Sequence, residues 1–389
     1  MAGYCVLEFA SLAELLAVGE APSTPDTRSC LSAVLDAANA CTDSLTVIVR
    51  VSSDSVNPWQ PAAPSSSSSS SSSSASAVVG AAPLAHPTAL FLPLERALAR
   101  LYSVPTDSFV ARDLVTAATT VVLEQLRNSP VCVPDSAHRS ARWNANQPGR
   151  AVTASDDNKG KARQAVDQKP APRSGSDALR APSATSLPRL FDVVALGGTF
   201  DHLHSGHKIL LTMAASITAR KLIVGVSDDA LLTKKKYREW LEPLDVRIRH
   251  VEDFVALVRP EIECACVPLQ DVYGPTADDP EVAALVVSDE TRAGGEAINT
   301  LRTSHSLQPL RVFCISLVAG DAAEASAADT LNRDRERERE RVEVSAATKM
   351  GSTGIREWLA RRRQAEEEEG EAEKEKEKEE EEEEAPGRR

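Results

Sequence analysis

The hydrophobic pattern of the chain changes near Leu190. Beyond this residue, short apolar runs alternate with segments of helical length; the runs are Val193–Leu196, Leu222–Val226, Ile262–Val267, Leu285–Val287 and Val312–Leu317. Continuous apolar strands that alternate with helices are typical of a parallel sheet covered on both faces. The pattern predicts an α/β fold with a Rossmann-like parallel sheet in the C-terminal half. Ligands bind such sheets at the carboxyl ends of the strands.

Before Leu190 the pattern is weaker. Within residues 89–127, Leu90, Leu94, Leu98 and Leu101 follow a helical spacing, and Thr46–Val51 is predicted to be a strand. These segments predict a small α+β region over residues 1–134. It carries no chemical signature, so we assign it no activity, and the role of residues 1–190 is left open.

Polar, low-complexity stretches separate and flank these regions. A serine-rich insert covers about 52–85, a linker covers 135–188, a low-complexity insertion covers 320–341, and an acidic tail covers 364–389. None of them has enough large apolar side chains to offset the entropy of ordering. We therefore predict disorder in the insert, the linker and the tail, and a surface excursion at 320–341. The folded C-terminal domain then covers residues 189–363.

Composition limits the functional classes. The net charge of −13 comes largely from the glutamates of the tail, which disfavours a nucleic-acid-binding protein. The seven cysteines are scattered without C-x-x-C spacing, and no cluster of carboxylates has the pattern of a metal site, so neither a disulfide framework nor a protein-made metal site is predicted. No apolar run reaches the roughly 20 residues that span a bilayer. These features predict a cytoplasmic protein that binds no membrane.

The first predicted strand leads directly into the sequence GGTFDHLHSGH at 197–207, followed by an apolar helical stretch. Backbone N–H groups and the positive end of the helix dipole converge on an anion at such a helix start. His204 and His207 are three residues apart, so they share one face of the first turn and can donate to the same phosphate. Gly206 lets the backbone approach that phosphate closely. The run predicts a phosphate-binding turn.

GGTFDHLHSGH resembles the T/H-x-G-H signature of the nucleotidylyltransferase superfamily and, within it, eukaryotic-type phosphopantetheine adenylyltransferase. Three further blocks resemble this family in the same order, namely GVSDDALLTKKKYREWLEPLDVRIRHVEDFV, LQDVYGPTADDPEVAALVVSDETRAGGEAINTLR and KMGSTGIREWL. The resemblance covers Phe191–Arg363 apart from the insertion 320–341. It departs at Gly351, where family members often have a serine, so one hydroxyl contact to the nucleotide is in doubt.

The resemblance implies transfer of AMP from ATP to 4′-phosphopantetheine, which gives dephospho-coenzyme A and pyrophosphate in coenzyme A biosynthesis. Mg²⁺ is expected because ATP carries it. The chain contains no P-loop sequence G-x-x-x-x-G-K-[ST], so a separate dephospho-coenzyme A kinase is expected to act on the product. The oligomeric state and any partner of the tail are left open.

The resemblance also implies the residue roles. His204, His207 and Lys235 are expected to be catalytic, although Lys234 or Lys236 could replace Lys235 as the substrate contact. The expected nucleotide- and substrate-binding residues are Gly198, Thr199, Phe200, Ser288, Asp289, Asn299, Ser352, Thr353 and Arg356. Two alternatives stay open, because Asp289 either caps the following helix or touches the ligand, and Arg356 either binds phosphate or is an ordinary exposed arginine.

The alternatives are another enzyme of the same superfamily or a homologue with weak catalytic activity. A cytidylyltransferase is disfavoured because Gly354-Ile355-Arg356 follows the Ser-Thr pair, where such enzymes typically close with R-T-x-G-I-S-T. A nicotinamide mononucleotide adenylyltransferase stays open. A catalytically weak regulatory homologue is disfavoured by the presence of Thr199, both motif histidines and Ser352.

Overall fold

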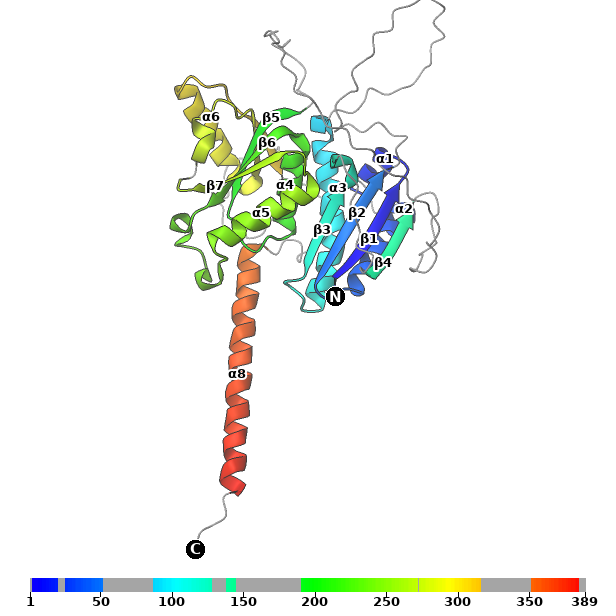
Figure 1. Cartoon of the computed structure of the whole chain (residues 1–389), viewed down its shortest axis with the longest axis vertical. Helices are drawn as coiled ribbons and strands as arrows, with labels where there is room; N and C mark the ends of the chain where they lie inside the picture. The colour runs from blue at the N-terminus through cyan, green and yellow to red at the C-terminus, as the bar shows by residue number, and fades with distance from the viewer. Residues whose placement is uncertain are drawn as a thin grey trace, which may run out of the picture.

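The computed structural model of the chain describes residues 2–19, 25–51, 87–127, 138–144, 190–271, 273–315 and 351–384. These residues form two parallel sheets that lie side by side, and a long C-terminal helix projects away from them (Figure 1). Within these ranges no helix is both long and apolar enough to cross a membrane.

The C-terminal sheet has five strands in the order β7-β6-β5-β8-β9, and every neighbouring pair is parallel. The strands are β5 Phe191–Gly198, β6 Thr218–Ser227, β7 Glu263–Leu269, β8 Ala284–Ser288 and β9 Arg311–Ile315. Each predicted apolar run overlaps one of them. The prediction of a Rossmann-like parallel sheet in this half is therefore confirmed.

Helices cover both faces of this sheet. Helices α4 (Ser205–Ile217) and α5 (Leu244–Val258) pack on one face, and α6 (Arg292–Ser304) packs on the other. Short 3-10 turns η3 Asp229–Leu232, η4 Arg238–Trp240, η5 Gly274–Ala277 and η6 Asp289–Thr291 complete the connections. Because β6 and β7 are added on one side of β5, and β8 and β9 on its other side, the order of strands in the sheet reverses at β5. A crevice at such a reversal is where α/β sheets bind ligands.

The N-terminal region differs from the predicted α+β class. Its strands β1 Ala2–Phe9, β2 Ser44–Val51, β3 Ala118–Leu123 and β4 His138–Asn144 form a parallel sheet in the order β3-β2-β1-β4. The accompanying helices are α1 Leu12–Ala17, α2 Pro25–Asn39, η1 Pro87–Leu90, α3 Phe91–Ala111 and η2 Glu124–Leu126. The region is thus α/β. Polar residues such as Glu8 in β1 and Thr120 in β3 interrupt the apolar pattern, so these strands were not predicted.

Strand β4 lies inside the predicted linker 135–188. Its sequence HRSARWN has few apolar side chains, but it pairs with β1 over Gly3–Glu8. Backbone pairing with a buried central strand therefore orders this segment, and the prediction of disorder is wrong for 138–144. The rest of the linker, the serine-rich insert and the insertion 320–341 lie outside the described residues.

The C-terminal helix also differs from the prediction. Helix α8 runs from Ser352 to Glu384, well into the predicted acidic tail, so disorder is wrong for 364–384. Side-chain pairs one turn apart accompany it, including Arg362 with Glu366 and Arg363 with Glu367. Such pairs and the strong helix propensity of Glu, Lys and Ala favour a solvated helix. Residues 385–389 are outside the described ranges.

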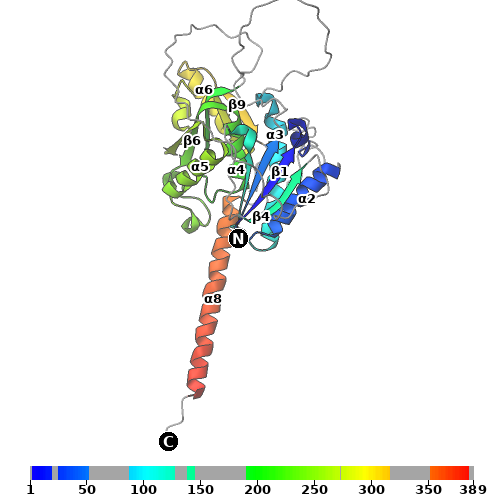
Figure 2. The same cartoon turned by 45° about the vertical axis from the view of Figure 1, so that its right-hand side comes forward.

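The two sheets share one hydrophobic core. A single cluster of buried side chains continues from the N-terminal strands through α3 to α4 and α5, and α3 lies beside α4 in both views (Figure 2). Thr106 on α3 and Ser205 on α4 are joined by a 3.0 Å hydrogen bond between their hydroxyl groups. The Trp358 indole of α8 donates to Asp113 at 2.6 Å. The predicted boundary near 189 therefore does not mark the edge of the core.

Candidate active site

A pocket of about 670 Å³ opens at the carboxyl ends of β5 and β8, where the strand order reverses. It is bounded by the turn after β5, the end of β6, the turn around η5, the start of α6 and the first turn of α8. Predicted site residues that line it are Gly198, Thr199, His204, His207, Lys235, Ser288, Ser352, Thr353 and Arg356. Four distant sequence blocks thus meet in one pocket.

The turn after β5 is a tight structure. Phe200 and His202 both have left-handed backbones, with φ of +52° and +46°. The Phe200 ring is fully buried below the pocket, with its centroid 5.2 Å from that of His207. A Cβ added at Gly198 would lie 3.1 Å from this ring, which explains the glycine. Phe200 therefore supports the turn from within the core and does not line the pocket, and its predicted contact with the nucleotide stays untested.

His204 is the N-cap of α4. Its Nδ1 accepts a hydrogen bond from the backbone N–H of Gly206 at 3.2 Å. A neutral imidazole that accepts at Nδ1 carries its hydrogen on Nε2, so the other ring nitrogen is a donor. The positive end of α4 and the Nε2–H of His204 are thus two groups at this helix start that an anion could use.

His204 and His207 form a stacked pair, with ring centroids 3.9 Å apart and planes 32° from parallel. Burial, with the nearby charges of Lys208 and His202, lowers the pKa of His204 to about 3. Burial, followed by the neighbouring histidines and Lys235, also lowers the pKa of His207 well below its ordinary value. Both rings are therefore neutral at pH 7 and act as hydrogen-bond donors. The buried Nδ1 of His207 has no partner among the described residues.

Positive charge in the pocket comes from Lys235 and Arg356. Of the lysines at 234–236, only Lys235 lines the pocket. The backbone carbonyl of Lys236 is used elsewhere, because it accepts from Nε of Arg356 at 3.1 Å. The geometry favours Lys235 over its neighbours, as the sequence predicts.

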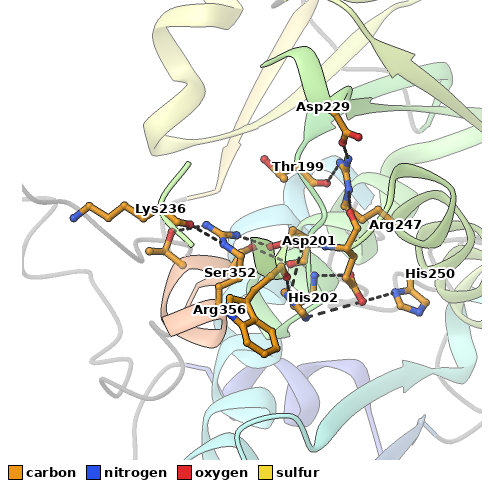
Figure 3. A network of polar contacts seen from close by, with 12 residues as sticks. Thr199, Asp201, His202, Asp229, Lys236, Arg247, His250, Ser352 and Arg356 are labelled. Atoms are coloured by element: carbon orange, nitrogen blue, oxygen red, sulfur yellow. Dashed lines mark hydrogen bonds and ion pairs between the residues drawn. The ribbon is translucent and has the colours of Figure 1, made fainter. Parts of the chain in front are cut away.

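Arg356 is buried, so the alternative of an ordinary exposed arginine is wrong. Its Nη1 pairs with Oδ2 of the buried Asp201 at 2.5 Å, and its Nη2 donates to the Thr353 hydroxyl at 3.1 Å (Figure 3). Ser352 donates to the Asp201 carbonyl at 2.8 Å. These contacts fasten the first turn of α8 to the turn after β5. They leave N–H groups of the guanidinium available to a phosphate.

Arg247 is a functional residue that the sequence prediction lacks. It is fully buried, and its Nη1 donates to the carbonyls of Thr199 at 2.9 Å and Ser227 at 2.7 Å (Figure 3). Its Nε donates to the Glu242 carbonyl at 2.9 Å. Arg247 therefore positions Thr199 and holds the ends of β5 and β6 together. The only signal in the sequence is an arginine on the apolar face of a helix.

Two predicted ligand residues have other roles. Both amide atoms of Asn299 bond to the backbone of Leu310, at 3.0 Å and 2.7 Å, and the residue does not line the pocket. Asp289 accepts from Arg292 at 2.8 Å and from the Cys314 thiol at 3.2 Å. The N-cap of η6 is Ser288, which pairs with Thr291, and the N-cap of α6 is Thr291, so Asp289 caps neither element. Asn299 and Asp289 thus support the strand exits, and their nucleotide contact stays a prediction.

No three His, Cys, Asp or Glu side chains gather in a way that could hold a metal ion within the described ranges. Tyr273, from the YGP turn, and Glu290 also line the pocket. The pocket therefore presents neutral donors, two cationic side chains and two helix starts, which together suit a polyphosphate.

The neutral histidines predict a dependence of stability on pH. The pKa of His204 is about 3 in the folded chain and ordinarily 6.5, so the unfolded chain binds more protons between these values. Stability is thus expected to fall as the pH drops below 6.5. His204→Asn retains a favourable N-cap but does not titrate. We expect the variant to lose roughly 1–2 kcal/mol less than the wild type between pH 6.5 and pH 4.5. Urea unfolding at both pH values measures this, and equal losses in the two proteins would contradict it.

Comparison with known proteins gives several matches. A family model described as cytidylyltransferase-like matches residues 195–324. The chain is 48% identical over 130 residues to the phosphopantetheine adenylyltransferase of Saccharomyces cerevisiae. This alignment covers 33% of this chain and 43% of the yeast protein. The chain is 43% identical over 128 residues to the protein of that name from Pyrobaculum aerophilum, covering 33% and 81% of the two chains. It is 37% identical over 137 residues to the phosphopantetheine adenylyltransferase of Methanopyrus kandleri, and this alignment covers 35% of this chain and 86% of that protein. The match thus spans less than half of the yeast relative.

Proposed function

Because the chain belongs to the phosphopantetheine adenylyltransferase family of nucleotidylyltransferases, we propose that it transfers AMP from ATP to 4′-phosphopantetheine. The products are dephospho-coenzyme A and pyrophosphate. One observation supports this proposal most directly. The stacked His204–His207 pair, Lys235 and Arg356 all line one pocket, at the point where the strand order reverses.

The proposed reaction is an in-line displacement. The phosphate of 4′-phosphopantetheine attacks the α-phosphorus of MgATP, the bond between the α- and β-phosphates breaks, and magnesium pyrophosphate leaves. Such a reaction needs positioning and charge stabilisation rather than covalent help from the protein. We expect the Mg²⁺ to arrive as part of the nucleotide.

Each group in the pocket has a part in this reaction. Neutral imidazole donors at His204 and His207 stabilise the negative charge that grows on the α-phosphate oxygens. Lys235 binds the attacking phosphate. The first turn of α8, with Ser352, Thr353 and the anchored Arg356, receives the β- and γ-phosphates at a helix start. Gly351 lacks a hydroxyl, but its backbone N–H does not depend on the side chain.

A pyrophosphate-release assay of the full chain tests the proposal. ATP and CTP are each offered with 4′-phosphopantetheine, phosphocholine and nicotinamide mononucleotide. We expect turnover with ATP and 4′-phosphopantetheine to exceed every other combination. Better turnover with CTP and phosphocholine, or with nicotinamide mononucleotide, would replace the acceptor but keep the reaction type. No pyrophosphate with any pair would favour a regulatory homologue. The separate downstream kinase and the cytoplasmic location stay predictions.

A further inference from the structure

The first turn of α4 has two faces with different contacts. His204 and His207, three residues apart, line the pocket at the carboxyl ends of β5 and β8, which we call the nucleotide pocket. Ser205 and Lys208, also three residues apart, share the adjacent face and bond to the N-terminal region. The turn that carries the two histidines is therefore attached, on its other face, to a part of the chain to which the sequence assigns no role.

Lys208 attaches α4 to the N-terminal sheet. Its side chain is buried, and its ammonium donates to the Thr119 carbonyl at 2.7 Å and to the Thr120 hydroxyl at 3.2 Å. Both acceptors belong to β3. Because a buried ammonium that moved away from these acceptors would lose its hydrogen bonds, the contact resists sliding of α4 along β3.

The hydrogen bond between α3 and α4 has a defined direction. The Thr106 hydroxyl donates its single hydrogen to the Tyr102 carbonyl, within its own helix, at 2.7 Å. It therefore accepts from the Ser205 hydroxyl, which is 3.0 Å away. Ser205 is the first residue of α4 and directly follows the N-cap His204. Helix α3 thus holds the start of the helix that carries both histidines.

A further bond joins the N-terminal region to α8. The Trp358 indole N–H donates to Oδ1 of Asp113 at 2.6 Å. Trp358 lies two residues after Arg356, in the part of α8 nearest the nucleotide pocket, and the rest of this helix projects away from the sheets (Figure 1). The position of α8 is therefore set by contacts of its first turns, and Asp113 makes one of them.

Asp113 occupies a position where glycine is usual. It follows the C-cap of α3 with a left-handed backbone, at φ of +58°. Its N–H and that of Leu114 bond back to the last turn of α3, at 3.0 Å and 2.8 Å, as in a Schellman motif. Arg112 fastens this corner to two carbonyls at and just beyond the end of α2, at 2.7 Å and 2.8 Å. Asp113 thus presents its carboxylate to Trp358 from a fixed support.

From these contacts we propose that the N-terminal region is a positioning part of the catalytic unit. It sets the start of α4 through Thr106 and the Lys208 contact, and the start of α8 through Asp113. None of these three side chains lines the nucleotide pocket, so each acts through a neighbour. The inference rests on the adenylyl transfer proposed above. The two helix starts are expected to affect different constants, because the histidines of α4 act in the transition state, whereas the start of α8 also binds phosphates in the ground state.

Asp113→Gly tests the contact with α8. The variant removes the acceptor of Trp358 but suits the left-handed backbone, so we expect little change in Tm. We expect the Kd and the KM for MgATP to rise about threefold to tenfold, with kcat within about twofold, as for the loss of one hydrogen bond. Asp113→Asn keeps an acceptor and tolerates this backbone, so it should bind MgATP as the wild type does.

Titration calorimetry with MgATP measures the Kd without any acceptor substrate, so the result does not depend on 4′-phosphopantetheine being the correct one. Unchanged affinity in Asp113→Gly, or equal loss in Asp113→Asn, would overturn the proposed role of Asp113. A purely structural contact would lower the Tm and leave the affinity for MgATP unchanged.

Thr106→Val tests the contact with α4. It keeps the shape of the side chain but leaves the Ser205 hydroxyl without this acceptor. We expect kcat to fall about threefold to tenfold and the Kd for MgATP to stay within about twofold. Thr303→Val is the matched control, because the exposed Thr303 hydroxyl on α6 also bonds to the carbonyl four residues back in its own helix, at 2.8 Å. Pyrophosphate release is measured with the substrate pair that the wild type uses best, and equal kcat in the two variants would overturn the role of Thr106.

Discussion

Replacing His207 with alanine is expected to lower kcat by about 10²–10³-fold and to leave the KM for ATP within a few-fold. His207 lies on the first turn of α4, stacked on His204, and its neutral ring gives a donor but no fixed charge. A neutral donor gains most when negative charge accumulates on the phosphate, which happens in the transition state. Losing it therefore affects the chemical step more than binding. Steady-state pyrophosphate release measures both constants.

His202→Ala is the matched control for this prediction. His202 lies in the same turn, but its Nε2 contacts the Trp240 carbonyl at 2.8 Å and its ring does not line the nucleotide pocket. We expect the variant to keep most of its activity. Equal damage from the two substitutions, or a defect of His207→Ala confined to KM, would leave His207 as a ground-state ligand or a support for the turn.

Asp201→Ala is expected to lower the free energy of unfolding by about 3–5 kcal/mol. Both members of its ion pair with Arg356 are almost completely buried, at 0% and 1% exposure. The substitution leaves a buried guanidinium with only the Lys236 carbonyl and the Thr353 hydroxyl as partners. It also loses the bond from the Glu242 backbone N–H to Oδ1, at 2.9 Å. Urea unfolding measures the effect.

An exposed pair on the same helix is the control. Glu367→Ala breaks the pair with Arg363, whose side chains are more than half exposed, and should cost at most about 1 kcal/mol. The double variant Asp201→Ala/Arg356→Met removes the stranded charge and should recover part of the loss. A loss for Asp201→Ala no larger than that for Glu367→Ala would mean that the buried pair does not hold α8 in place.

The C-terminal sheet could be predicted from sequence because its buried strands are continuous apolar runs. The phosphate-binding turn could also be predicted, since two histidines on one helical face give a local signal. Arg247 and Asn299 could not be placed in the same way. Their roles depend on backbone groups brought close only by the fold, such as the carbonyl of Ser227 and both backbone groups of Leu310.

The N-terminal sheet and α8 were harder to predict from the sequence, because the interactions that order them leave no apolar pattern. Strand β4 is ordered by pairing with β1, an interaction that leaves no apolar signature in its own sequence. In α8, low hydrophobicity correctly indicates that no core covers the far end, but it does not exclude a helix stabilised by local charge pairs. Apolar content alone therefore does not predict β4, which depends on strand pairing, or α8, which depends on local charge pairs.

The shared core has a consequence for protein engineering. The segment matched by the family model, 195–324, contains the catalytic turn but lacks two of its supports. Helix α3, which contacts Ser205 through Thr106, precedes it, and the α8 turn that supplies Arg356 follows it. A graft of the matched segment into another host would leave α4 without its neighbour and Asp201 without its counter-ion. The transferable unit of this protein is larger than the segment that the family model matches.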